Sequence, residues 1–173
     1  MDHLWSPWRY RYVTKSGASE GCLFCVKSAE QRDQENLIVF RGVHSFVLLN
    51  LYPYTSGHVM IAPYEHVPVL EEASPEALME MTGLLRRTAQ ILRKLYKPDG
   101  MNIGMNIGEC AGAGVAGHIH MHVLPRWCGD TNFMTTVGET RVLPEELPVT
   151  WQRLRQEFEE PPPDQVATFG RSS

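Results

Sequence analysis

The chain has 173 residues, of which 43% are hydrophobic, and its 16 basic and 20 acidic side chains give a formal charge of -4. This composition is typical of one globular domain with a hydrophobic core, and it excludes a basic nucleic-acid-binding domain. No apolar run reaches the roughly 20 residues of a membrane-spanning helix, and residues 1–5 do not start a signal peptide. We therefore expect a cytoplasmic protein that binds neither nucleic acid nor membranes.

A C-x-x-C pair lies near the start of the chain, at Cys22 and Cys25, whereas Cys110 and Cys128 are isolated. In a reducing compartment such a pair indicates a metal site or a redox site more often than a structural disulfide. A redox pair of the thioredoxin kind follows a strand, and no strand pattern precedes Cys22. The pair alone therefore favours a metal site, with ordinary buried thiols as the alternative.

Three strand patterns come next, over residues 37–40, 45–50 and 58–62. Each is a short apolar run bounded by turn residues, which is typical of strands joined in hairpins. Pro63 is expected to close the third strand, because proline cannot donate a hydrogen bond to the neighbouring strand.

One long helix follows, from Ser74-Pro75 to Pro98-Asp99-Gly100. Serine is a favoured N-cap, and proline is tolerated in the first helical turn. Apolar residues recur at steps of three, four and seven, which predicts one face packed on a core: Leu78, Met81, Leu85, Leu92 and Leu95.

Two further strands are predicted over residues 101–107 and 118–124, and a last helix over about 145–158 carries Trp151, Leu154 and Phe158 on one face. Strands in meander order around a central helix predict an α+β fold with one antiparallel sheet of five strands. We expect a single domain over residues 1–160, including an N-terminal extension (1–21), and a disordered tail at 161–173.

Three histidines alternate with apolar residues in the predicted fifth strand: His118-Ile119-His120-Met121-His122-Val123. Side chains two positions apart on a strand share a face, so the three imidazoles are expected on one side and the apolar residues in the core. Burying three polar rings is costly unless each has a partner, so the pattern predicts a functional site.

Two kinds of site fit this pattern. The three imidazoles could bind one metal ion, as in some hydrolases. Alternatively, one imidazole could act as a nucleophile beside residues 108–117, where four glycines in ten residues could present backbone N–H groups to a phosphate. Such a loop alone could be a flexible hairpin, but its position directly before the histidines favours phosphate chemistry.

With these motifs the sequence resembles the histidine-triad (HIT) superfamily of nucleotide hydrolases and transferases. Upstream of the histidines, residues 50–53, 57–63 and His66 are similar to the family's ribose-binding strand and the strand after it. In all, the resemblance covers Cys22 to Arg126. The flanks resemble the bacterial subgroup of diadenosine tetraphosphate phosphorylases (ATP adenylyltransferases), at Leu4-Trp5-Ser6-Pro7, Pro125-Arg126-Trp127, Gly129-Asp130, Asn132-Phe133-Met134 and Thr140-Arg141-Val142-Leu143-Pro144.

The resemblance implies catalytic roles for His118, His120 and His122. His120 would attack the α-phosphorus and carry the nucleotidyl group as a phosphoramidate. His122 would donate a hydrogen bond to the α-phosphate oxygens, and the backbone of Gly112 and Gly114 would add donors to the developing charge.

The resemblance also implies a nucleotide site. Asn50 would hold the ribose hydroxyls, Asn106 would contact the nucleotide or the leaving group, and His58 would support the catalytic histidines. Many relatives place a serine or threonine hydroxyl just before the triad, where this chain has residues 113–117 without one, so backbone donors must replace that hydroxyl.

Metal-containing relatives imply a zinc site made of Cys22, Cys25, His66 and His118. A closed set of four such ligands is structural. It would pin the N-terminal segment to the catalytic strand and orient His120.

The resemblance thus implies an enzyme that acts on a purine nucleotide or dinucleoside polyphosphate, and that splits diadenosine polyphosphates with inorganic phosphate as acceptor. A related hydrolase that uses water on dinucleoside polyphosphates or nucleoside phosphoramidates is the first alternative. A nucleotide-binding or scaffold protein without turnover is the second. The resemblance further implies a homodimer built from the long helix and a strand edge.

Overall fold

The computed structural model describes residues 21–131 and 145–161. The predicted N-terminal extension up to residue 20, the motifs within 132–144 and the predicted tail from residue 162 lie outside the described residues. The described helices are α2 (Leu23–Ala29), α3 (Asp33–Asn36), α4 (Pro75–Tyr96) and α6 (Leu147–Glu159), with short 3-10 turns η1 (Leu70–Glu72) and η2 (Glu109–Ala111). The strands are β1 (Ile38–Arg41), β2 (Ser45–Leu49), β3 (Val59–Pro63), β4 (Gly100–Met105) and β5 (Met121–Arg126).

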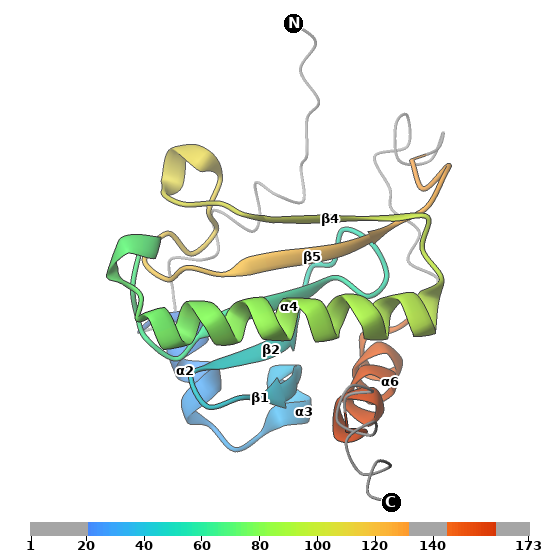
Figure 1. Cartoon of the computed structure of the whole chain (residues 1–173), viewed down its shortest axis with the longest axis horizontal. Helices are drawn as coiled ribbons and strands as arrows, with labels where there is room; N and C mark the ends of the chain where they lie inside the picture. The colour runs from blue at the N-terminus through green and yellow to red at the C-terminus, as the bar shows by residue number, and fades with distance from the viewer. Residues whose placement is uncertain (1–20, 132–144, 162–173) are drawn as a thin grey trace, which may run out of the picture.

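The five strands form one antiparallel sheet in the order β1-β2-β3-β5-β4 (Figure 1). The predicted α+β class with a five-stranded antiparallel sheet, a long helix and a C-terminal helix is confirmed. The predicted meander order is wrong at one place, because β5 lies between β3 and β4. Helix α4 crosses the sheet, and the strand that follows it, β4, forms the outer edge. Strand β5 then lies between β3 and β4 and pairs with both of them.

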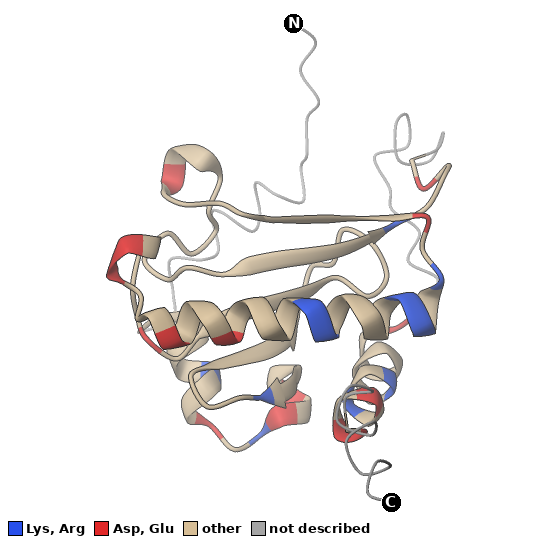
Figure 2. Ribbon diagram, in the orientation of Figure 1, with Lys and Arg blue, Asp and Glu red and all other residues tan. Residues whose placement is uncertain are grey.

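Helix α4 begins as its sequence predicts, since the Ser74 hydroxyl accepts a hydrogen bond from the Ala77 N–H at 3.2 Å. Met81 and Leu92 from the predicted face are buried, and the other three predicted residues pack partly buried at its edges. Acidic residues gather toward the amino end of α4 and basic residues toward its carboxyl end (Figure 2), which is the distribution that the helix dipole favours.

The sheet has a different apolar cluster on each face. Helices α4 and α6 cover one face, where Met81, Leu92 and Leu154 pack on the strands. On the other face Phe24 of α2 packs on strand residues, namely Ile38, Phe46, Leu48, Met60 and Ala62. Burying one such side chain stabilises the fold by about 1.5–3 kcal/mol, so both layers are firmly attached.

Among the helices of the described residues, none combines the length and the apolar character that crossing a bilayer requires.

Candidate functional site

The first two histidines of the alternating motif lie just outside the sheet. The predicted fifth strand over 118–124 starts later, at Met121, because the Ile119 N–H donates to the Val67 carbonyl at 2.9 Å instead of pairing with β3. His122 is on β5, opposite Met60 of β3 and Gly104 of β4. Of the three apolar residues predicted to lie in the core, Ile119 and Val123 are buried and Met121 is partly buried against the core cluster.

His120 is buried and held by its own backbone neighbour. Its Nδ1 lies 2.9 Å from the His118 carbonyl oxygen, which can only accept, so Nδ1 carries the proton. The Nε2 atom of the neutral ring therefore keeps its lone pair. Burial lowers the pKa of His120, with the carbonyl contact opposing the shift, so the neutral form is favoured at pH 7.

His122 has the opposite tautomer, which His58 determines. The Tyr54 N–H donates to His58 Nδ1 at 3.2 Å, so the proton of the neutral His58 ring is on Nε2. That Nε2 lies 3.0 Å from Nδ1 of His122 and donates to it. The proton of neutral His122 is consequently on its Nε2. Burial, with a smaller contribution from the nearby His120, lowers the pKa of His122 to about 4.

Asn50 lies at the end of β2 next to His58. Its Oδ1 accepts from the Tyr52 N–H at 3.0 Å, and its Nδ2 is 3.5 Å from Nδ1 of His58. This amide is therefore a second donor directed at the same His58 nitrogen, which agrees with the tautomer set by Tyr54. The predicted ribose contact of Asn50 stays a prediction.

The glycine-rich loop is folded rather than open. It contains η2, and Gly108 and Gly112 have φ of +81° and +88°, a region that side chains rarely adopt. The Gly112 N–H donates to the Glu109 carbonyl at 2.9 Å, and the Asn106 amide donates to the Gly112 carbonyl at 3.5 Å. The Gly112 N–H is thus already used inside the loop, and Gly114 is exposed.

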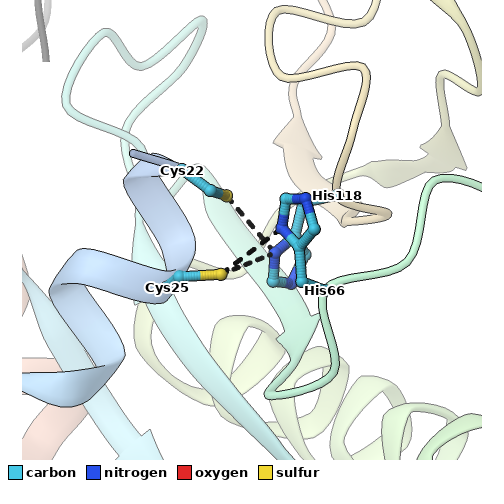
Figure 3. Close-up of side chains that lie close together, drawn as sticks. All are labelled: Cys22, Cys25, His66 and His118. Atoms are coloured by element: carbon cyan, nitrogen blue, oxygen red, sulfur yellow. Dashed lines mark hydrogen bonds between the residues drawn. The ribbon is translucent and has the colours of Figure 1, made fainter. Parts of the chain in front are cut away.

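A second group of side chains lies beside His118. Cys22 and Cys25 project from the start of α2 toward His66 and His118 (Figure 3), and the four ligand atoms all lie within 4.8 Å of one another. The Cys22 Sγ is 3.4 Å from His118 Nδ1, and the Cys25 Sγ is 3.4 Å from His66 Nδ1. The structure therefore brings together all four residues of the predicted metal site.

The donor set fits zinc in both chemistry and spacing. In a tetrahedral site with zinc–sulfur bonds of about 2.3 Å and zinc–nitrogen bonds of about 2.0 Å, sulfur and nitrogen lie about 3.5 Å apart. The Cys25 Sγ is 3.6 Å from His118 Nδ1, close to that value. His118 also donates from Nε2 to the Pro63 carbonyl at 2.9 Å, which orients Nδ1 toward the sulfurs as the outer partners of metal ligands do.

Two residues at the site were missed by the sequence reasoning. Phe24 has 1% of its surface exposed, and its ring packs against the rings of His118 and His120. Gly104 lies opposite His122, and a Cβ at Gly104 would meet no atom within 4 Å. A glycine within a strand can indicate a close approach by a ligand, so Gly104 had a usable signal. Phe24 had only its position between two cysteines.

The profile described as the HIT domain matches residues 31–128. An AP-4-A phosphorylase of Mycobacterium tuberculosis is 35% identical over 170 residues, covering 94% of this chain and 87% of that protein. A bis(5'-nucleosyl)-tetraphosphatase (asymmetrical) of Schizosaccharomyces pombe is 33% identical over 89 residues, covering 51% of this chain and 48% of that protein.

Among solved structures, a zinc-bound histidine triad family protein of Mycobacterium smegmatis has a TM-score of 0.64 and 25% identity, covering 86% of this chain and 97% of that one. The match of the HIT profile includes all three histidines of the motif, His58 and His66, but it begins after the two cysteines. The cysteine half of the metal cluster therefore rests on the geometry of α2.

Proposed function

The chain belongs to the HIT family, and on that premise we propose that it cleaves the α-phosphate linkage of diadenosine tetraphosphate, with inorganic phosphate as acceptor. The reaction is a nucleotidyl transfer through a covalent intermediate on His120. The AP-4-A phosphorylase relative supports this choice of substrate, because it matches nearly the whole chain.

The observation that carries the proposal is the pair of opposite tautomers. His120 presents an unprotonated Nε2, whereas His122 presents a protonated one. Their ring centroids are 5.0 Å apart. One phosphate group between them would meet a nucleophile and a hydrogen-bond donor together, which is the requirement of covalent phosphoryl chemistry.

In the first step Nε2 of His120 attacks the α-phosphorus, a P–N bond forms, and the P–O bond to the departing polyphosphate breaks. The leaving group from diadenosine tetraphosphate is ATP. Meanwhile His122 donates from Nε2 to an α-phosphate oxygen. In the second step an oxygen of inorganic phosphate attacks the same phosphorus, the P–N bond breaks, and ADP leaves.

The nucleotide would lie along the sheet face that carries His122. Gly104 leaves room directly beside that ring. Asn50 is proposed to contact the ribose hydroxyls through the second lone pair of its Oδ1 and the second proton of its Nδ2, since Tyr52 and His58 engage the first of each. Asn106 and the backbone of Gly114 are proposed to contact the phosphates, while the engaged N–H of Gly112 acts by holding the loop.

Cys22, Cys25, His66 and His118 are proposed to hold one structural zinc ion. When bound, the ion would supply four strong bonds that tie α2 to the segment before β5. It would not contact substrate, because all four positions of a tetrahedral site are then filled by protein.

A homodimer is proposed through the outer edge of the sheet. Among the described residues, β4 has a hydrogen-bonded neighbour on one side only. Its Ile103 is 49% exposed and pairs with Val123, whose side chain packs in the cluster of α4. Met79 of α4 is 71% exposed. Paired β4 edges would cover Ile103 and complete the hydrogen bonds of both strands.

The test is to incubate the protein with diadenosine tetraphosphate, with and without inorganic phosphate, and to identify the products. ATP and ADP formed only with phosphate would support the proposal. AMP and ATP formed without phosphate would instead make the chain a hydrolase, the activity named for the Schizosaccharomyces pombe relative. Binding without any product would contradict both and favour a non-catalytic nucleotide-binding protein.

A further inference from the structure

We infer that Phe24 is a positioning residue for the nucleophile: its ring holds the imidazole of His120 in the orientation that attack requires. The inference deepens the proposed function and rests on it. It starts from the contacts around His120, whose ring has two aromatic neighbours. Phe24 lies 4.8 Å away between centroids at 38°, and His122 lies 5.0 Å away at 74°.

One hydrogen bond does not fix a ring. The contact from Nδ1 to the His118 carbonyl sets the tautomer of His120, but the imidazole can still turn about its Cβ–Cγ axis. The two packed rings restrict this freedom. Because Nε2 lies off the Cβ–Cγ axis about which the ring turns, even a small turn displaces the attacking atom.

Phe24 is itself rigidly supported. It is 1% exposed and packs into the cluster formed with Phe46, Leu48 and other strand residues. The flanking Cys22 and Cys25 contact the side chains of His118 and His66, so both sides of this helical turn are anchored. The same Phe24 ring also packs on His118, at 5.1 Å and 46°. Phe24 therefore packs both on His118, which faces the cysteines, and on His120, the proposed nucleophile.

The test compares Phe24→Leu with Phe46→Leu. Both changes remove a flat ring from the same buried cluster and keep an apolar side chain, but Phe46 packs on Tyr64 rather than on a histidine. We expect both variants to keep their metal content and to lose similar thermal stability. A displacement of about 1 Å at a reacting atom can lower a rate on the order of a hundredfold.

For Phe24→Leu, kcat and the single-turnover rate of adduct formation should fall on the order of ten- to a hundredfold with KM nearly unchanged, whereas Phe46→Leu keeps both rates. Equal losses in the two variants, no loss, or a rise in KM alone would overturn the inference. A rise in KM alone would mean that Phe24 contacts the nucleotide.

A readout without turnover separates this inference from the proposed function. In NMR spectra of the ligand-free protein, the His120 ring should give one sharp set of signals in wild type and in Phe46→Leu, and broadened or multiple sets in Phe24→Leu. If wild type forms no adduct while this contrast holds, positioning stands and the proposed reaction fails. If His120 signals stay sharp in Phe24→Leu, positioning fails whatever the activity.

Discussion

The three histidines of the motif have different partners although they alternate in sequence. His118 points Nδ1 at two cysteines, His120 donates to a backbone carbonyl, and His122 accepts from His58. A single metal bound by all three, which the alternation alone allowed, does not fit these contacts. His118 donates from Nε2 to Pro63 and directs Nδ1 at the cysteines, and His122 accepts at Nδ1 and carries its proton on Nε2. In each ring, the nitrogen that contacts a neighbouring group decides whether the other nitrogen carries a proton or a lone pair.

The opposite tautomers can be measured directly. Nitrogen-15 NMR at pH 7.5 should show the proton on Nδ1 of His120 and on Nε2 of His122. Replacing His58 by Phe removes the donor to His122, so that ring should populate both tautomers and kcat should fall about tenfold or more. His44→Gln, at an exposed position, is the control. A His122 signal with a protonated Nδ1 in wild type would refute the assignment.

Acid should destabilise the fold through His122. Burial lowers its folded-state pKa to about 4, whereas the unfolded value is about 6.5, so the unfolded chain binds this proton first. The stabilisation is complete above pH 6.5 and is lost as the pH falls toward 4. We expect urea unfolding to show a loss on the order of 2 kcal/mol over this window that His122→Gln lacks. Identical slopes for both proteins would count against a buried neutral His122.

At the scale of elements, the regular strands and long helices could be predicted because their patterns are local. The cap at Ser74 and the buried face of α4 follow from the sequence, and so do four of the five strands to within about two residues. β5 was placed too early because its start depends on tertiary contacts, the Ile119 N–H to Val67 and the His118 ring to Pro63.

Helix α2 and the sheet order could not be predicted for the same reason. α2 has only seven residues, too few to be stable alone, and it is held by the burial of Phe24. The order of the strands depends on where the chain re-enters the sheet after α4, which is set by tertiary packing. At the site, the sequence predicted that the histidines gather, but the assignment of Cys22, Cys25, His66 and His118 to one cluster came from family resemblance, not from spacing.

β4 offers a steric test of where the substrate lies. Gly104 and Gly100 are both on β4, face the same side, and have no atom within 4 Å of an added Cβ, but only Gly104 is opposite His122. Gly104→Val should therefore raise KM about tenfold or more while the melting temperature stays close to that of Gly100→Val. Gly100→Val should keep wild-type kinetics. Equal kinetics in the two variants would move the substrate away from β4.

At the scale of the whole molecule, the cysteine–histidine cluster joins distant parts of the chain. Cys22 and His118 are 96 positions apart, and the cluster connects α2 with the segment that carries His120. A bound metal ion would close this long loop, which restricts the unfolded chain and stabilises the fold.

Protein purified without added metal should contain about one zinc ion per chain by elemental analysis. Cys22→Ser should lose the ion and lower the melting temperature by several degrees, whereas Cys128→Ser, at an exposed cysteine outside the cluster, should change neither. A Cys22→Ser variant that keeps its zinc, or metal-free wild type of equal stability, would show that the four residues are not zinc ligands.

The most direct test of the account is to map the covalent intermediate. Wild-type protein mixed with diadenosine tetraphosphate and quenched without acid should carry one adenylyl group on His120, and added inorganic phosphate should release it as ADP. His120→Asn should form no adduct, with nucleotide affinity within about tenfold of wild type and turnover lower by about a thousandfold or more. An adduct on another residue, or substantial turnover by His120→Asn, would contradict the account.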